Sequence, residues 1–257
     1  MTTLITVLVV LVFAVLLYVF YRMQKRHAKF STRVYTALAI GIVFGGLLQL
    51  IFGVDNQVIS QSMEWINIVG EGYVGFLQML IMPLVFVSIV GAFTKMKVSE
   101  KLGKISATVL TSLLATTAIA ALIGIGTTIL FGLQGAKFTE GAAETARISE
   151  LATRQESIQG LTIPQQILSF IPKNVFADLA GTRATSTIGV VIFAAFVGIA
   201  YLGVKRKAPK EAEFFANLID SLYKIVMRIV TLVLRLTPYG VFALMTNVMA
   251  TSDFVAI

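Results

Sequence analysis

The chain has 257 residues, of which 57% are apolar and only 13% are charged, and its mean hydropathy is +0.87. Soluble domains carry about a quarter charged residues, so this composition excludes an ordinary soluble protein and predicts a protein that lies in a bilayer. The sequence contains no cysteine, which excludes disulfides, thiol nucleophiles and thiolate metal sites. The net charge of +8 indicates basic cytoplasmic loops rather than nucleic-acid binding, because aromatic and basic residues do not interleave outside the apolar runs.

The first apolar run, 4–20, is followed by a basic segment and not preceded by one. A secretory signal peptide has the opposite order of charge, so the run is predicted to be a retained helix with its amino terminus outside. The second run, 34–52, contains Gly41 and Gly45 at GxxxG spacing. This spacing indicates either a face for helix packing or simply a glycine-rich membrane helix.

The stretch from Gly70 to Gly91, which is uncharged from Tyr73 onward, carries Pro83 in its middle. Proline cannot bond to the carbonyl of Met79 and its ring clashes with it, so a soluble helix rarely keeps a proline there. A membrane helix tolerates the break where neighbouring groups satisfy the freed carbonyl. The stretch therefore predicts a spanning helix inside a bundle, in which Pro83 is either a hinge or a static bend.

Three further apolar segments follow in the chain. The run 106–130 predicts a span, and the polar segment 131–161 that follows predicts a loop. Prolines and charges interrupt 163–185, which predicts a helix in several pieces before a clean span at 186–204. The run 214–250 is longer than one bilayer core needs, so we expect it to start in the interface, tilt, or bend at Pro238, which could also be a hinge.

The distribution of basic residues supports a topology with six crossings. Loops 22–33, 94–105 and 204–214 then share one side of the membrane and hold thirteen of the 21 lysines and arginines, whereas the opposite loops hold three. The positive-inside rule places the basic loops in the cytoplasm and both ends of the chain outside.

Few side chains in these runs indicate chemistry. The sequence has no Walker loop, no HExxH motif and no pair of acids inside a span, so we expect neither an enzyme, a resident cofactor nor a metal site. Thr116 and Thr117 lie in a hydroxyl-rich helix, where hydroxyl oxygens either bind a dehydrated sodium ion or bond to carbonyls four residues back. Three charges of 214–250 are spaced by four residues, and a fourth follows seven residues later on the same face: Asp220, Lys224, Arg228 and Arg235. They indicate either a pathway or side chains that reach the membrane interfaces.

Four segments resemble the dicarboxylate/amino acid:cation symporter family, the glutamate-transporter homologues. They are FLQMLIMPLVFVSIVGA (76–92), KLGKI (101–105), LSFIPKNVFADL (168–179) and LTPYGVFALM (236–245), and they occur in family order. The additional first helix, GAAETARI at 141–148 and FIPKNVFADL at 170–179 resemble, within this family, the bacterial L-cystine symporters.

The resemblance implies an all-α elevator transporter, in which a transport domain moves against a static scaffold that forms a homotrimer. It divides the chain into an additional helix and basic loop, 1–33, and the amino-terminal portion of the symporter domain, 34–257. Thr116 and Thr117 fall where the family places a Thr-Ser pair that lines one sodium site, although Leu113 replaces the tyrosine before that pair. Substrate-binding residues are expected beyond residue 257. The family helices correspond to 34–53, 57–93, 163–204 and 212–250 in the scaffold, and to 106–131 in the transport domain.

We therefore expect the amino-terminal portion of a sodium- or proton-coupled importer of an amino acid, L-cystine in the first place, in the inner or plasma membrane. Its partners would be the substrate, the lipid bilayer and two further copies of the chain. Two alternatives remain open: a membrane scaffold that transports nothing, and a symporter for glutamate, aspartate or another dicarboxylate.

Overall fold

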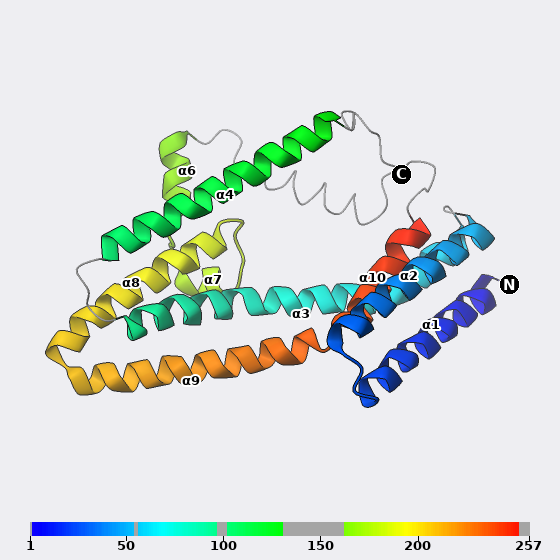
Figure 1. Cartoon of the computed structure of the whole chain (residues 1–257), viewed down its shortest axis with the longest axis horizontal. Coiled ribbons are helices and arrows are strands. Elements are labelled where there is room, and N and C mark those ends of the chain that lie inside the picture. Colours follow the sequence, from blue (N-terminus) through cyan, green and yellow to red (C-terminus); the bar gives the residue numbers. More distant parts are fainter. Residues whose placement is uncertain (1, 54–55, 97–101, 131–161, 252–257) are drawn as a thin grey trace. The chain divides into compact units, whose positions relative to one another are not determined.

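The structure is a computed structural model that describes residues 2–53, 56–96, 102–130 and 162–251, and this part of the chain is all-α (Figure 1). The long helices are α1 (Thr2–Lys25), α2 (Phe30–Phe52), α3 (Gln57–Lys95), α4 (Leu102–Leu130), α8 (Ser186–Lys207) and α9 (Pro209–Leu234). The shorter helices are α6 (Ile163–Ser169), α7 (Val175–Leu179) and α10 (Thr237–Thr251). The predicted all-α fold is confirmed.

Several of these helices match the dimensions of a bilayer, whose hydrocarbon core needs about 20 apolar residues. Among the described residues, α1, α2, α3 and α8 are each long and apolar enough to cross a membrane. Helices α9 and α10 meet this criterion together, as a span bent by 47° where they join, and α4 contains a shorter apolar stretch, Leu114–Leu130. The protein is therefore a multi-pass membrane protein, as predicted.

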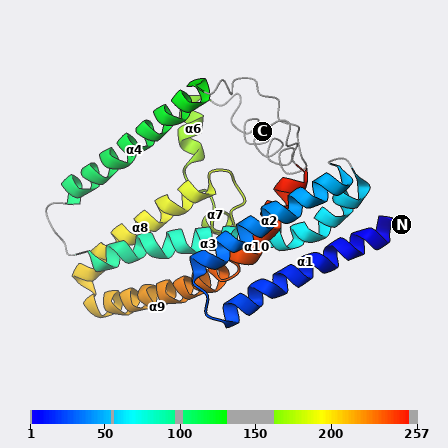
Figure 2. The ribbon, with the colours of Figure 1, turned by 45° about the vertical axis from the view of Figure 1, so that its right-hand side comes forward.

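Helix α3 packs along its length against two groups of helices (Figures 1 and 2). Its first half buries Ile59, Met63 and Ile66 in a core shared with α1, α2 and α10. Its second half packs Leu80 against α9 and Val90 against both α8 and α9. One long helix thus contributes to three apolar clusters.

The core around the first half of α3 is centred on an aromatic cluster. The ring of Phe242 in α10 is fully buried and lies 4.9 Å from the ring of Phe13 and 5.2 Å from that of Phe20, both in α1. The ring of Phe44 in α2 lies 6.1 Å away. Each such ring pair adds about 1 kcal/mol beyond the area that it buries. The additional first helix is therefore an integral part of this core.

The helices differ from the predicted segments mainly at their ends and breaks. The interrupted region 163–185 does form several pieces, α6 and α7, and α8 follows at the predicted span 186–204. The expected run 212–250 is broken between Leu234 and Thr237, and the expected loop 131–161 lies outside the described residues. The chain divides into two compact units, and α4 belongs to a different unit from the other described helices.

Candidate functional site

Among the described residues, the short helix α7 has defined hydrogen-bonded caps at both of its ends. Asn174 begins this helix as its N-cap, and its side-chain oxygen accepts hydrogen bonds from the backbone N–H groups of Phe176 and Ala177 at 3.0 and 3.2 Å. Gly181 ends the helix with φ of 72°, a conformation that glycine adopts without steric cost. The N–H groups of Gly181 and Thr182 then bond to carbonyls of the helix, which is the Schellman arrangement.

This turn brings together two opposite charges that lie five residues apart. Arg183 donates from Nε to Oδ1 of Asp178 at 2.8 Å and from Nη2 to Oδ2 at 2.7 Å. The side chain of Asp178 is 1% exposed, whereas that of Arg183 is 32% exposed. Bidentate pairs of this kind are the stronger class of charge-assisted hydrogen bond, and they fix the geometry of both partners.

The same arginine connects α7 to the helices on either side. Its Nη1 donates to the carbonyl of Ser169 at the end of α6, at 3.2 Å, and its backbone N–H donates to the hydroxyl of Ser186 at the start of α8. Gly189 of α8 lies against the carboxylate, since a Cβ there would be 2.8 Å from Oδ2 of Asp178. The interrupted segment is therefore a defined elbow, held by one buried ion pair.

Sequence reasoning treated Asp178 and Arg183 only as residues that interrupt the apolar pattern. The sequence did contain a signal for this ion pair: two opposite charges lie on either side of a Gly-Thr turn in an otherwise apolar region. Charges at membrane depth are expensive unless they pair, so a charge there calls for a named partner.

The second break in an apolar run lies between α9 and α10, near Pro238. Pro238 is the second residue of α10, and the first turn of a helix tolerates proline because its N–H groups have no partner within the helix. The hydroxyl of Thr237 donates to the carbonyl of Leu234 at 2.7 Å, so this carbonyl is satisfied although Pro238 cannot donate to it. The hydroxyl of Tyr73 in α3 lies 2.9 Å from the same Thr237 oxygen. The bend therefore lies just before Pro238, and its use as a hinge stays a prediction.

Pro83, by contrast, lies inside one continuous helix. Helix α3 runs from Gln57 to Lys95 through the proline without interruption. The structure places no chain break there, and a hinge role for Pro83 stays a prediction.

Gly41 and Gly45 lie against α10. A Cβ at Gly41 would be 2.9 Å from the Cβ of Met245, and one at Gly45 would be 2.5 Å from the backbone oxygen of Thr246. Both glycines are buried. Helices α2 and α10 approach so closely here that neither position has room for a side chain.

The two threonines predicted to bind a cation lie on α4, which is helical from Leu102 to Leu130. The hydroxyl of Thr116 donates to the carbonyl of Ser112 at 3.0 Å. This is the bond to the carbonyl four residues back that the sequence left open as an alternative. A hydroxyl oxygen keeps its lone pairs when it donates, so the bond leaves Thr116 able to serve as a ligand. The cation role of Thr116 and Thr117 stays a prediction.

Helix α9 has one buried face and one polar face. The buried residues recur every seven positions: Ala212, Ile219, Val226 and Val233. At 100° per residue most polar side chains of the helix fall on the opposite face, and Arg235 directly after the helix continues it: Lys210, Glu213, Asn217, Asp220, Ser221, Lys224, Arg228 and Thr231. Lys224 and Asp220 form an ion pair at 2.8 Å whose lysine side chain is 74% exposed. The predicted shared face of the charges thus exists in the helix, and the role of these charges in a pathway or at the membrane interfaces stays a prediction.

Comparisons with known proteins agree on one group of transporters. Residues 30–257 match the sodium:dicarboxylate symporter family. The chain is 53% identical to the L-cystine uptake protein TcyP of Bacillus licheniformis over 98% of its residues and 54% of that protein, and 53% identical to TcyP of Bacillus subtilis over 98% and 55%. TcyP of Shouchella clausii is also 53% identical, over 99% of the chain and 54% of the relative. The chain spans about half the length of these curated relatives.

Proposed function

Since the chain belongs to the sodium:dicarboxylate symporter family, we propose that it forms part of a secondary active transporter that takes up L-cystine. The observation that carries the proposal is the 53% identity, over 98% of the chain, to proteins named for L-cystine uptake. Such a transporter moves its substrate unchanged, so no catalytic residue is required. Uptake would be driven by symport with a sodium ion or a proton.

We assign most of the described helices to a static scaffold. Two features support this role: α3 belongs to three apolar clusters, and Gly41 packs against α10 without room for a side chain. Helix α4 is the proposed contribution to the moving domain, and its membership of a different compact unit supports a separate role. Thr116 and Thr117 would supply hydroxyl ligands to one cation site.

The proposed transporter lies in the cell membrane and assembles as a homotrimer through its scaffold. Its basic loops would be cytoplasmic and its amino terminus external, because the loops that share a side with 22–33 carry most of the lysines and arginines. Cysteine-scanning accessibility tests this orientation, since the chain has no cysteine of its own. A cysteine at position 3 should react with an impermeant maleimide in intact cells, whereas one at position 27 should not.

The central test is uptake of radiolabelled L-cystine by cells that lack their own cystine transporters. Cells that express the chain within its complete reading frame should accumulate label, and excess unlabelled L-cystine should compete. Because the chain spans about half the length of its relatives, residues 1–257 alone should give no uptake. Uptake by this short form would refute the proposal that residues 1–257 are only part of the transporter. Competition by glutamate but not by L-cystine would refute the proposed substrate.

The proposed cation ligands can be tested with a matched pair of variants in the complete transporter. Thr116→Val/Thr117→Val removes two hydroxyls at nearly constant volume and should raise several-fold the sodium or proton concentration that gives half-maximal uptake. Thr127→Val/Thr128→Val makes the same change further along α4, where both hydroxyls donate to the carbonyl of Gly124, and should leave that concentration unchanged. Equal effects of the two variants would assign the hydroxyls to helix structure alone.

A further inference from the structure

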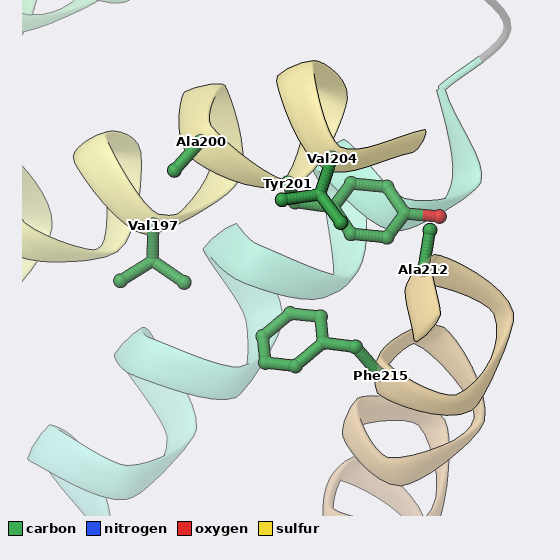
Figure 3. A pocket seen from close by; sticks show the side chains of 6 residues that line it. All are labelled: Val197, Ala200, Tyr201, Val204, Ala212 and Phe215. Atoms are coloured by element: carbon green, nitrogen blue, oxygen red, sulfur yellow. The ribbon is translucent and has the colours of Figure 1, made fainter. Parts of the chain in front are cut away.

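An apolar cleft lies between α8 and α9, close to the point where one helix leads into the other (Figure 3). Its volume is about 280 Å³, close to the lower bound of roughly 300 Å³ for pockets that hold small molecules. The rings of Tyr201 and Phe215 face each other across the helix pair, with centroids 5.8 Å apart. The lining residues are Val197, Ala200, Tyr201 and Val204 of α8, and Ala212 and Phe215 of α9.

Exposed basic side chains lie in the segment that joins α8 to α9, at one end of the cleft. Helix α8 ends in Lys205, Arg206 and Lys207, and Lys210 lies in the first turn of α9. The Nζ of Lys205 lies 5.9 Å from the centroid of the Tyr201 ring, so one lysine of this segment contacts a residue that lines the cleft. The acidic residues of the same segment are Glu211 and Glu213, so the four basic charges exceed the acidic ones by two.

This combination matches one class of ligand. A narrow apolar cleft accommodates part of a hydrocarbon chain, and a basic cluster at the end of a membrane helix attracts the phosphate of an anionic lipid. The acyl chain of a zwitterionic lipid also fits the cleft, but its neutral headgroup gains little from the basic side chains. A soluble anion is attracted by the basic side chains but has no hydrocarbon chain to place in the cleft.

We propose that the cleft binds one acyl chain of an anionic phospholipid of the phosphatidylglycerol type, whose phosphate lies on Lys205 and its basic neighbours. The volume suits one chain segment, so the rest of the lipid remains in the surrounding bilayer. The lipid would fix the corner between α8 and α9, where the cleft separates two helices that also meet α3 through Val90. The proposal is independent of the transported substrate.

Native mass spectrometry of the purified protein in detergent tests the proposal, with phosphatidylglycerol and phosphatidylcholine added at equal concentrations. We expect phosphatidylglycerol adducts to predominate. Lys205→Gln should weaken phosphatidylglycerol binding about fivefold, the usual effect of one basic side chain near an anionic lipid. Ala200→Phe fills the cleft while it leaves all four basic charges in place, and should weaken binding of the same lipid.

Lys25→Gln is the matched control, because the Nζ of Lys25 also lies over a tyrosine ring, that of Tyr21, at 5.1 Å. This lysine does not line the cleft, so its removal should leave binding unchanged. Equal retention of the two lipids, an equal loss with Lys25→Gln, or unchanged binding with Lys205→Gln would each overturn the proposal. Displacement of the lipid by glycerol phosphate alone would also overturn it, because the acyl chain would then contribute nothing.

Discussion

Arg183→Gln is expected to destabilise the elbow between α6 and α8 more than Asp178→Asn does. The reason is the unequal burial of the two partners, 1% exposed for the aspartate side chain and 32% for the arginine. Removal of the guanidinium leaves a carboxylate with no access to water. Removal of the carboxylate charge leaves an arginine that still reaches solvent and still donates to the carbonyl of Ser169.

The magnitudes follow from the geometry. Removing one partner of a buried pair costs about 3 to 5 kcal/mol, and Arg183→Gln should fall near 3 kcal/mol because the arginine is only partly buried. Asp178→Asn should cost about 1.5 kcal/mol, the value of one charge-assisted hydrogen bond. The double variant should cost less than the sum of the single variants, because both act on the same interaction.

Unfolding by sodium dodecyl sulfate in mixed micelles, followed by far-ultraviolet circular dichroism, measures these differences. Hydrogen exchange of peptides that cover 169–186 reports whether the loss is local. Lys224→Gln serves as the control, since its exposed ion pair with Asp220 should contribute no more than about 0.5 kcal/mol. A larger effect for Asp178→Asn than for Arg183→Gln, or a cost of Arg183→Gln no greater than that of Lys224→Gln, would refute the reasoning.

Further substitutions test the helix contacts by the same unfolding assay. Gly45→Ala should destabilise by about 2 kcal/mol, because its Cβ would lie 2.5 Å from a backbone oxygen of α10. Gly72→Ala, where a Cβ meets nothing within 4 Å, should instead stabilise by about 0.5 kcal/mol. A change of the same sign in the free energy of unfolding for both variants would contradict the close packing at Gly45. Thr237→Val should cost about 1.5 kcal/mol, since it removes the hydroxyl contact with Tyr73 and leaves a carbonyl of α9 unsatisfied; no change would contradict this role. Asn174→Ala should cost about 1 kcal/mol and increase exchange in α7, whereas unchanged exchange would show that the cap is dispensable.

The membrane helices were predictable because length and hydropathy are strong, local signals. The run 34–52 differs from α2 by a few residues at its start, and the stretch 70–91 lies within α3. The interrupted pattern at 163–185 likewise predicted several pieces, which α6 and α7 confirm. These features depend on composition over a short window, which can be read from the sequence without knowledge of contacts between distant segments.

The contacts between segments were not predictable in the same way. The GxxxG spacing marks Gly41 and Gly45 as a close approach, but their neighbours Met245 and Thr246 lie about two hundred residues further along the chain. The ion pair of Asp178 with Arg183 requires the positive φ of Gly181, which turns the chain back on itself. Their spacing of five residues does not place the two charges on one face of a helix, so the sequence did not predict that they pair.

The two prolines show why breaks are harder to predict than spans. Pro83 is surrounded by helix on both sides and α3 continues through it, whereas the chain turns by 47° before Pro238, between α9 and α10. Proline removes a donor in either position, so the residue type does not distinguish the two cases. The second site differs because the Thr237 hydroxyl satisfies the carbonyl that Pro238 cannot reach, while Tyr73 of α3 holds that hydroxyl in place. In a bilayer, where water cannot satisfy a freed carbonyl, a turn can form only where such a substitute donor exists. The turn before Pro238 is therefore supported by the hydroxyl next to the proline and by a contact from another helix, and a window of sequence around the proline contains only the first of these.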